Sequence, residues 1–127
     1  MQTESEIKLA RYGAVEKEAD KFGRVIGVRR LKPSEQAKVA GMTADLAGSD
    51  EMFGPTGEKI LIPHRLQIQI AAAVCMIDEA RIPFPRNRGE LDAIFDRLDV
   101  EGITAAGAAL VRLTVDDVTD PKDEAKN

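Results

Sequence analysis

The sequence is poor in the residues that build most catalytic and metal sites. Among 127 residues it has one cysteine, one histidine and no tryptophan. Cys75 therefore has no disulfide partner within the chain, and its apolar context AAAVCMI favours a buried structural thiol over a reactive one. One His and one Cys are too few for a zinc site of nitrogen and sulfur ligands within one chain. We predict no metal site and no cofactor.

Recognisable catalytic patterns are also lacking. A Ser–His–Asp arrangement would have to include His64, and no serine lies in a nucleophile-elbow context. The carboxylates of Asp96 and Asp99 lie beside an apolar helical pattern, where solvent exposure is the expectation rather than acid chemistry. No glycine cluster matches a phosphate-binding loop, and no calcium-loop pattern is present. These observations predict a protein that is not an enzyme.

Neither a basic excess nor a long apolar run is present. The chain has 18 basic and 22 acidic residues, a net charge of −4, whereas nucleic-acid binders usually carry a basic excess. The longest apolar run, Ile70–Ile77, is far shorter than the roughly 20 residues that span a bilayer. The segment Met1–Asp20 lacks the apolar core of a secretory signal. We predict a cytoplasmic protein with neither a nucleic-acid nor a membrane partner.

What is present is the composition of an ordinary globular domain, with 43% hydrophobic and 31% charged residues. Aromatic residues make up only 4%, so the core must be aliphatic, which suits helix-on-helix packing. The expected fold is mainly α (α+β): a small helical domain with an N-terminal β-hairpin and a disordered acidic C-terminal tail. The expected boundaries are a flexible segment at 1–12, in which a short helix is the alternative, the domain at 13–113, and the tail at 114–127.

Local patterns in the first half predict four segments. A hairpin is expected in AVEKEADKFGRVIGVRRL, where Gly27 marks a bulge or a close backbone approach. A helix is expected in KPSEQAKVAGMTADLAG, with Pro33 in its first turn. The glycine-rich stretch GSDEMFGPTGEK is expected to be a loop, and KILIPH a short apolar run that forms a strand or leads into the next helix.

The second half has the stronger helical patterns. HRLQIQIAAAVCMIDEA is apolar on two faces and is expected to be a central helix. IDEARIPFPRN is expected to be a tight connection, with a short strand at Arg81 and Ile82 as an option. Asn87 and Glu90 form a capping-box pattern ahead of an amphipathic helix, DVEG interrupts that helix, and ITAAGAALVRL resumes it.

Five residues are candidates for an interaction surface, each with a structural alternative. Met52 and Phe53, at the tip of the expected loop, either fold back onto the core or contact a partner. Phe84 lies between two prolines. It either packs on the following helix as a hydrophobic staple or serves as an exposed anchor for another protein. Arg86 and Arg88 are either solvated or a patch for an acidic partner. We take Phe84, Met52 and Phe53 as apolar anchors and Arg86 and Arg88 as flanking charges.

The segment AAAVCMIDEARIPFPRNRGELDAIFDRLDVEGITAAGAAL resembles the small tail-assembly chaperones of long-tailed bacteriophages and their prophage remnants. The likeness lies in an apolar helix running into IDEARIPFP and in the later junction RLDVEGITAAGAAL. The front half, GRVIGVRRL followed by KPSEQAKV, is similar to theirs as well. The likeness covers residues 23–113, and the stretch GSDEMFGPTGEKILIPH and the acidic tail depart from it.

This resemblance implies a non-enzymatic role. Such chaperones coat the long helical tape-measure protein, keep it soluble before the tail tube polymerises around it, and can recruit tail-tube protein. Homo-oligomer formation stays open. The alternatives are a structural component of the phage particle, such as a minor tube or connector protein, and a small DNA-binding regulator using Arg81, Arg86 and Arg88.

Overall fold

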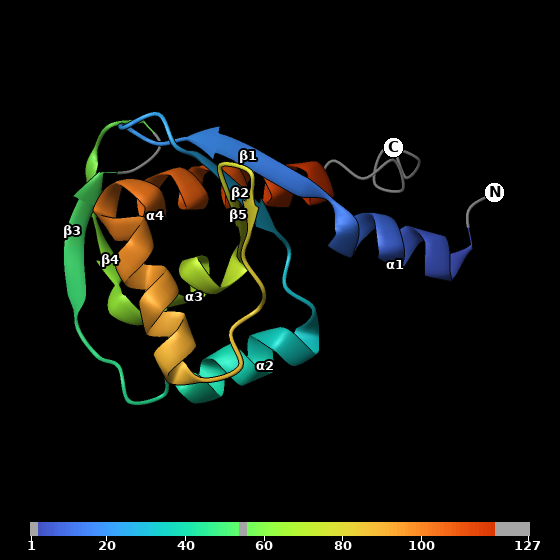
Figure 1. The fold of residues 1–127 in the computed structure, drawn as a ribbon, viewed down its shortest axis with the longest axis horizontal. Coiled ribbons are helices and arrows are strands. Elements are labelled where there is room, and N and C mark those ends of the chain that lie inside the picture. Colours follow the sequence, from blue (N-terminus) through green and yellow to red (C-terminus); the bar gives the residue numbers. More distant parts are fainter. Residues whose placement is uncertain (1–2, 54–55, 119–127) are drawn as a thin grey trace.

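The computed structural model describes residues 3–53 and 56–118 and has an α+β architecture (Figure 1). Within these residues, four helices accompany six strands in two antiparallel sheets. The strands are β1 (Val15–Ala19), β2 (Val25–Arg29), β3 (Ser49–Phe53), β4 (Lys59–Pro63), β5 (Val74–Ile77) and β6 (Ala80–Arg81). The helices are α1 (Glu4–Gly13), α2 (Pro33–Met42), α3 (His64–Ala73) and α4 (Arg88–Val118). One sheet has the strand order β1-β2-β5-β6, and the other pairs β3 with β4.

The prediction of a mainly helical domain with a single hairpin is wrong, because helices account for 51% and strands for 24% of the structure. Part of the difference is the β3–β4 hairpin, which occupies the stretch predicted to be a loop. Its five residue pairs place Met52 opposite Ile60 and Asp50 opposite Ile62. Met52 is buried, whereas Phe53 and Leu61 point outward. The hairpin therefore has the inside–outside alternation of a strand pair, although its glycines suggest a loop.

The central helix is also shorter than predicted. α3 ends at Ala73, and Val74–Ile77 forms β5, which pairs antiparallel with β2. The apolar run does not by itself distinguish a buried helix from a buried strand. β2 needs a partner on its second edge, and β5 supplies it with Ile77 opposite Ile26 and Val74 opposite Val28. The long-range pairing therefore overrides the local helical pattern.

The β1–β2 hairpin and the role of Gly27 are confirmed. Five antiparallel pairs join β1 to β2, and the register of β2 against β5 shifts between Gly27 and Val28. A side chain at position 27 would place its Cβ 3.1 Å from Met76 Cβ and 3.3 Å from Val15 Cγ1. Glycine at this position therefore allows β2 to run closely between its two neighbouring strands.

The predicted interruption in the last helix is present at Asp99. This residue has φ 56° and ψ −174°, which breaks α4 into two parts (Figure 1). Asp99 Oδ1 accepts a hydrogen bond from Val100 N at 2.8 Å, at the start of the second part. The first part begins as predicted, since Glu90 N donates to Asn87 Oδ1 at 2.9 Å. The Glu90 carboxylate, however, accepts from Arg86 N rather than from Asn87 N.

The two ends of the chain differ from the expectation in different ways. α1 lies within the segment for which a frayed end and a short helix were both open, and it extends away from the sheet (Figure 1). α4 continues to Val118, so the boundary expected at Thr114 lies within this helix. Residues 119–127 of the expected tail lie outside the described residues. In the part of the chain that is described, no helix has the length and apolarity to cross a bilayer.

The buried core joins the first sheet to α3 and α4. α4 packs on β1 and β2 as well as on α3, and the largest fully buried aliphatic side chains come from β2, α2, β5 and α4. These are Ile26, Val28, Val39, Val74, Leu91 and Leu98. The core is aliphatic, as the low aromatic content indicates. One face of α3 lies in this core, and its other face is the starting point of the candidate site.

Candidate functional site: a groove between three helices

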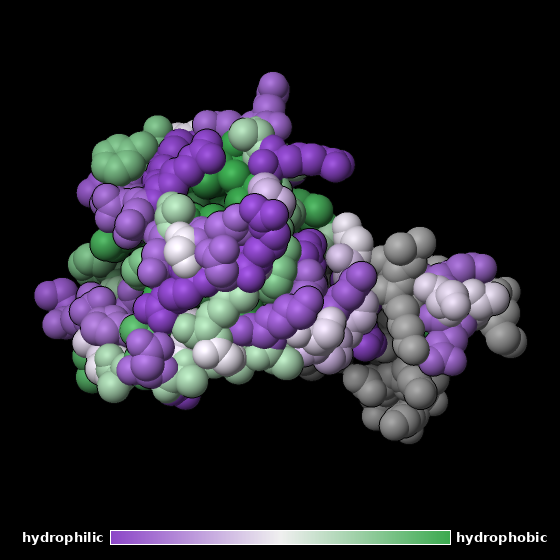
Figure 2. Space-filling model, turned by 60° about the horizontal axis from the view of Figure 1, so that its bottom comes forward, coloured by the Kyte–Doolittle hydropathy of each residue, from purple (hydrophilic) through white to green (hydrophobic). Residues whose placement is uncertain are grey.

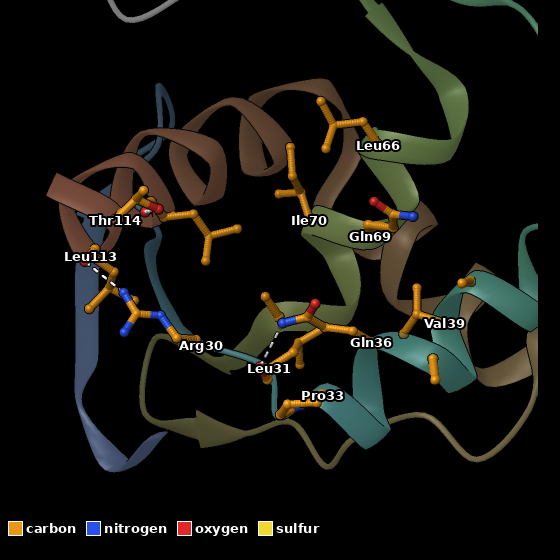
Figure 3. Close-up of a pocket in the computed structure, with 14 residues that line it drawn as sticks. Arg30, Leu31, Pro33, Gln36, Val39, Leu66, Gln69, Ile70, Leu113 and Thr114 are labelled. Carbon is orange, nitrogen blue, oxygen red and sulfur yellow. Dashed lines mark hydrogen bonds between the residues drawn. The ribbon is translucent and has the colours of Figure 1, made fainter. Parts of the chain in front are cut away.

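A groove of about 680 Å³ lies between α2, α3 and the second part of α4. Figure 3 shows side chains from all three helices pointing into it. Most of its lining is apolar: Leu31, Pro33, Ala37, Val39, Ala40, Leu66, Ile70, Ala73, Leu110 and Leu113. The remaining four lining residues are Arg30, Gln36, Gln69 and Thr114. A groove with this lining suits an apolar or amphipathic ligand more than a charged metabolite.

The floor of the groove is the second apolar face of α3. Ile68, Ala71 and Ala72 are buried in the core on one side of this helix. Leu66 and Ile70 lie on the other side, where Leu66 remains 44% exposed. The central helix inferred from the sequence is therefore only half enclosed, and its open half faces the groove.

Small side chains on α2 and branched ones on α4 form the two walls. Ala37 and Ala40 are exposed on α2 and line the groove on one side, and Leu110 and Leu113 line it from α4. Because alanine occupies little space, the α2 wall stays set back from the floor and leaves room for another side chain. Figure 2 shows apolar side chains gathered among hydrophilic ones on the side of the molecule where α2 lies.

A second, smaller hollow of about 400 Å³ adjoins the first and shares Leu66 and Gln69 with it. Its other lining residues are Leu46, Ala47, Gly48, Pro63 and Arg65. The two hollows are neighbours that share two lining residues, and we refer to them together as the α2–α3 groove. It extends from Thr114 on α4 to Gly48 after α2.

Hydrogen bonds fix the walls at both ends of the α2–α3 groove. Arg30 Nη2 donates to Leu113 O at 2.8 Å and so connects the chain before α2 to α4. Arg65 donates to three backbone carbonyl oxygens just after α2. The distances are 3.3 Å to Thr43 O, 3.2 Å to Ala44 O and 3.3 Å to Leu46 O. These carbonyls would otherwise need other donors near the end of the helix. The groove is thus a fixed feature of the fold.

One further ion pair sets the position of α3 against the β3–β4 hairpin. His64 Nε2 lies 2.9 Å from Asp50 Oδ2, and His64 Nδ1 lies 3.2 Å from Ala47 O. The hydrogen bond to Asp50 raises the pKa of His64. Both side chains are substantially exposed, so this pair positions the hairpin without forming a catalytic cavity.

The two candidate anchors on β3 differ in placement. Met52 is 6% exposed and packs in the core, whereas Phe53 is 61% exposed on the outer face of the hairpin. Leu61, which is 73% exposed, belongs to the same outward-facing set by strand alternation. Phe53 therefore remains available for contact, and Met52 does not.

The other three candidates lie at the start of α4. Phe84 is half-buried and packs against the apolar core. Arg86 pairs with Glu90 at 2.9 Å. Arg88 Nε lies 2.8 Å from Asp92 Oδ1, and Arg88 Nη1 donates to Met42 O at 2.8 Å, so this residue connects α4 to α2. They belong to different elements from Met52 and Phe53, and none of the five lines the α2–α3 groove.

The groove could have been found from a signal that the sequence does contain. The sequence shows α3 to be apolar on two faces, and the core buries only one of them fully. The sequence does not indicate that α2 and α4 pack beside the second apolar face of α3. That placement depends on the hydrogen bonds of Arg30 and Arg65, which join residues far apart along the chain.

Other sites for chemistry are poorly supported. Burial raises the pKa of the Cys75 thiol, which makes its reactive thiolate less available. Within residues 3–53 and 56–118, no three His, Cys, Asp or Glu side chains gather as metal ligands would. The α2–α3 groove is the best-formed candidate site in the described structure. Comparison of this chain with protein-family models, with curated proteins and with solved structures gives no match.

Proposed function

We propose that this protein is a phage tail-assembly chaperone that binds the tape-measure protein and keeps it soluble until the tail tube assembles. The proposal starts from the resemblance of AAAVCMIDEARIPFP and RLDVEGITAAGAAL to such chaperones. The observation that carries it is the α2–α3 groove, an open apolar depression with helical walls. A groove of this kind takes the apolar face of an amphipathic helix.

The chemistry of the partner fits such a surface. A tape-measure protein is long and largely helical, so before assembly it exposes apolar stripes that favour aggregation. Leu66, Ile70 and Leu110 offer branched side chains between which the apolar residues of a helix can pack. Burial of such side chains stabilises a complex by removing apolar surface from water.

The residues that carry the resemblance support the scaffold around the groove. Asp78, in IDEARIPFP, has a positive φ of 54°. Its side-chain Oδ1 accepts a hydrogen bond from Val25 N at 3.0 Å, and its backbone N–H donates to Val25 O at 2.7 Å. Gly102, in RLDVEGITAAGAAL, lies where a Cβ would approach Leu98 Cβ to 2.9 Å. These positions join β5 to β2 and allow α4 to fold closely at its break. The likeness to the chaperones is therefore a likeness in scaffold residues.

Co-expression with a fragment of a tape-measure protein tests the proposal. We expect the fragment to be insoluble alone and to elute as a soluble complex with this protein. Leu66→Ser should weaken the complex, because Leu66 is 44% exposed and lines the groove. Val111→Ser is the matched control, because Val111 is 49% exposed on α4 but lines neither hollow.

Three results would contradict the proposal. One is a fragment that stays insoluble in the presence of the folded protein. A second is a complex that Leu66→Ser and Val111→Ser affect equally, which would place the contact outside the groove. The third is detection of the protein in purified particles by mass spectrometry, because a chaperone leaves before the particle is complete.

A further inference from the structure

His64, the first residue of α3, connects three segments of the chain. Its ring lies between Asp50 on β3 and Ala47 in the segment that leads from α2 to β3. Nε2 is 2.9 Å from Asp50 Oδ2, and Nδ1 is 3.2 Å from Ala47 O. The backbone N–H of His64 also donates to Gly48 O at 3.1 Å. Because Ala47 and Gly48 line the smaller hollow, His64 joins the β3–β4 hairpin to a wall of the α2–α3 groove.

Both ring contacts of His64 require a protonated imidazole. A backbone carbonyl and an ionised carboxylate only accept hydrogen bonds, so each ring nitrogen must carry a hydrogen. Asp50 is held in its ionised form, because hydrogen bonds from His64 and Gln67 lower the pKa of its carboxyl group. A neutral imidazole has a single N–H and cannot donate to both partners. The geometry around His64 is therefore that of the cationic ring.

Within the described residues, Asp50 is the charged group that contacts this ring. The other charged side chains on the surrounding elements have partners elsewhere. Glu51 pairs with Lys59 at 3.9 Å, Asp45 pairs with Arg88 at 3.2 Å, and Arg65 donates to the carbonyls after α2. The hydrogen bond to Asp50 raises the pKa of His64 above its ordinary value of 6.5. The charge of His64 is therefore set mainly by one carboxylate.

Gly48 gives the chain a pivot beside the ring. Its φ is 91°, a conformation that residues with a side chain rarely adopt. A Cβ at this position would lie 3.4 Å from His64 Nδ1, so the glycine also lets the ring approach. If the bond to Ala47 O is lost, the backbone bond from His64 N to Gly48 O is the remaining contact of His64 with this turn.

We propose that His64 is a pH-sensitive switch, which in its cationic form fixes the turn at Ala47 and Gly48 to the β3–β4 hairpin and releases Ala47 when it loses a proton. The neutral ring keeps the bond to Asp50, because a hydrogen bond to a charged group is the stronger one. The lone pair of Nδ1 then faces the oxygen of Ala47, and the two no longer attract each other.

The sign of the effect follows from the raised pKa of His64. The contact is fully present below about pH 6.5, the ordinary value, and is lost as the pH rises through the pKa of the folded protein. The smaller hollow therefore has a fixed wall at mildly acidic pH and a looser wall at mildly alkaline pH. This change does not depend on whether a partner occupies the groove.

An NMR titration of the intact protein tests the charge of the ring. His64 is the only histidine of the chain, so its ring signals are assigned without ambiguity. We expect a pKa above 6.5, with both ring nitrogens protonated below it and the hydrogen on Nε2 above it. Asp50→Asn should return the pKa toward 6.5. A wild-type pKa at or below 6.5, or a raised pKa that persists in Asp50→Asn, would overturn the inference.

Amide hydrogen exchange tests the release of the turn. Protection factors, which correct for the pH dependence of exchange itself, are compared from about pH 6 to 8.5. We expect those of residues 45–53 to fall by about two- to fivefold, because the pair is exposed, while the β1–β2 hairpin keeps its protection. His64→Gln, which does not titrate, should show no such fall. Lys59→Gln is the control, because it removes an exposed charge from the same hairpin and should behave as wild type.

Thermal unfolding at pH 6 shows that each variant is folded before exchange is compared. An equal fall in wild type and His64→Gln would assign the pH dependence to another group and overturn the inference. A loss of protection spread evenly over the chain would do the same, since it would indicate global destabilisation instead of release at Ala47. Neither result bears on solubilisation of a tape-measure fragment, so this inference and the proposed function fail separately.

Discussion

The guanidinium of Arg24 is held by the carboxylate of Asp20, with Arg24 Nε 2.6 Å from Asp20 Oδ2. The Asp20 side chain is fully buried, and its Oδ1 accepts hydrogen bonds from the backbone N–H groups of Phe22 and Arg24, both at 2.9 Å. Arg24 then donates to Arg97 O at 2.8 Å and to Leu98 O at 2.7 Å. The turn of the first hairpin thus caps the carbonyl end of the first part of α4, just before its break.

Asp20→Asn should destabilise the protein by about 2 kcal/mol, because it leaves Arg24 without its buried counter-charge. Burial alone would raise the pKa of Asp20, but hydrogen bonds from Arg24 and from the backbone hold that pKa below its usual value. Urea unfolding measures the change. Asp96→Asn, at an exposed position on α4, is the control and should stay within about 0.5 kcal/mol of wild type. Equal effects would show that the Asp20–Arg24 pair does not hold the break of α4.

Two helical glycines should respond to alanine in opposite directions. At Gly102, the added Cβ would lie 2.9 Å from Leu98 Cβ and 3.4 Å from Arg24 Nη2, so Gly102→Ala should cost about 1–3 kcal/mol. At Gly41 on α2, nothing lies within 4 Å of the added Cβ, so Gly41→Ala should stabilise by about 0.5–1 kcal/mol. Thermal unfolding of the two variants checks both signs. Stabilisation by Gly102→Ala would refute the close packing at this junction.

The pair of Arg29 and Glu35 should make stability depend on pH in the acid range. Arg29 Nη1 and Nη2 donate to Glu35 Oε1 and Oε2 at 2.8 and 2.7 Å, which lowers the pKa of Glu35 from 4.5 to about 2. Because this pKa is depressed in the folded state, the contribution is fully present above pH 4.5 and is lost as the pH falls toward 2.

Glu35→Gln measures this contribution. It should cost about 1–2 kcal/mol near neutral pH, after allowance for solvent screening of a partly exposed pair. The difference in urea midpoint between the variant and wild type should shrink as the pH falls below 4.5. A stability difference that stays constant down to pH 2 would mean that the negative charge of Glu35 does not contribute to stability.

Replacing Phe84 with alanine should reduce stability more than replacing Phe53, because Phe84 packs on the core and Phe53 is exposed. Phe84→Ala should cost about 2 kcal/mol, because the ring is half-buried against the core. Phe53→Ala should change stability by less than about 0.5 kcal/mol, because Phe53 is 61% exposed. Denaturant titration gives both values. If Phe53→Ala also weakens a tape-measure complex, the anchor role predicted for Phe53 is supported, and an unchanged complex would argue against that role.

Local signals in the sequence are sufficient for the features that depend on neighbouring residues. The β1–β2 hairpin, the special position of Gly27, the start of α2 at Pro33 and the break in DVEG all belong to this class. Each rests on turn residues, capping or the backbone freedom of glycine, which act over a few residues. The structure contains all four.

Features that depend on distant residues are not predictable in the same way. Val74–Ile77 has the apolar character of either a helix or a strand, and β2, almost 50 residues earlier, determines which one forms. The glycines and the proline around the β3–β4 hairpin predict a loop. The alternation of buried and exposed side chains can be recognised only once Met52 is known to pair with Ile60. The groove required the positions of three helices, which no single segment specifies.

The contact between α4 and the first strand has a consequence for folding during translation. Arg112 Nε lies 3.0 Å from Glu16 Oε1, and Arg112 Nη2 donates to Lys17 O at 2.7 Å, across 96 and 95 residues. The β1–β2 hairpin therefore leaves the ribosome well before the part of α4 that covers it. This contact cannot form until Arg112 has cleared the exit tunnel, and a sheet whose contacts are this distant in sequence is exposed to aggregation while they are incomplete.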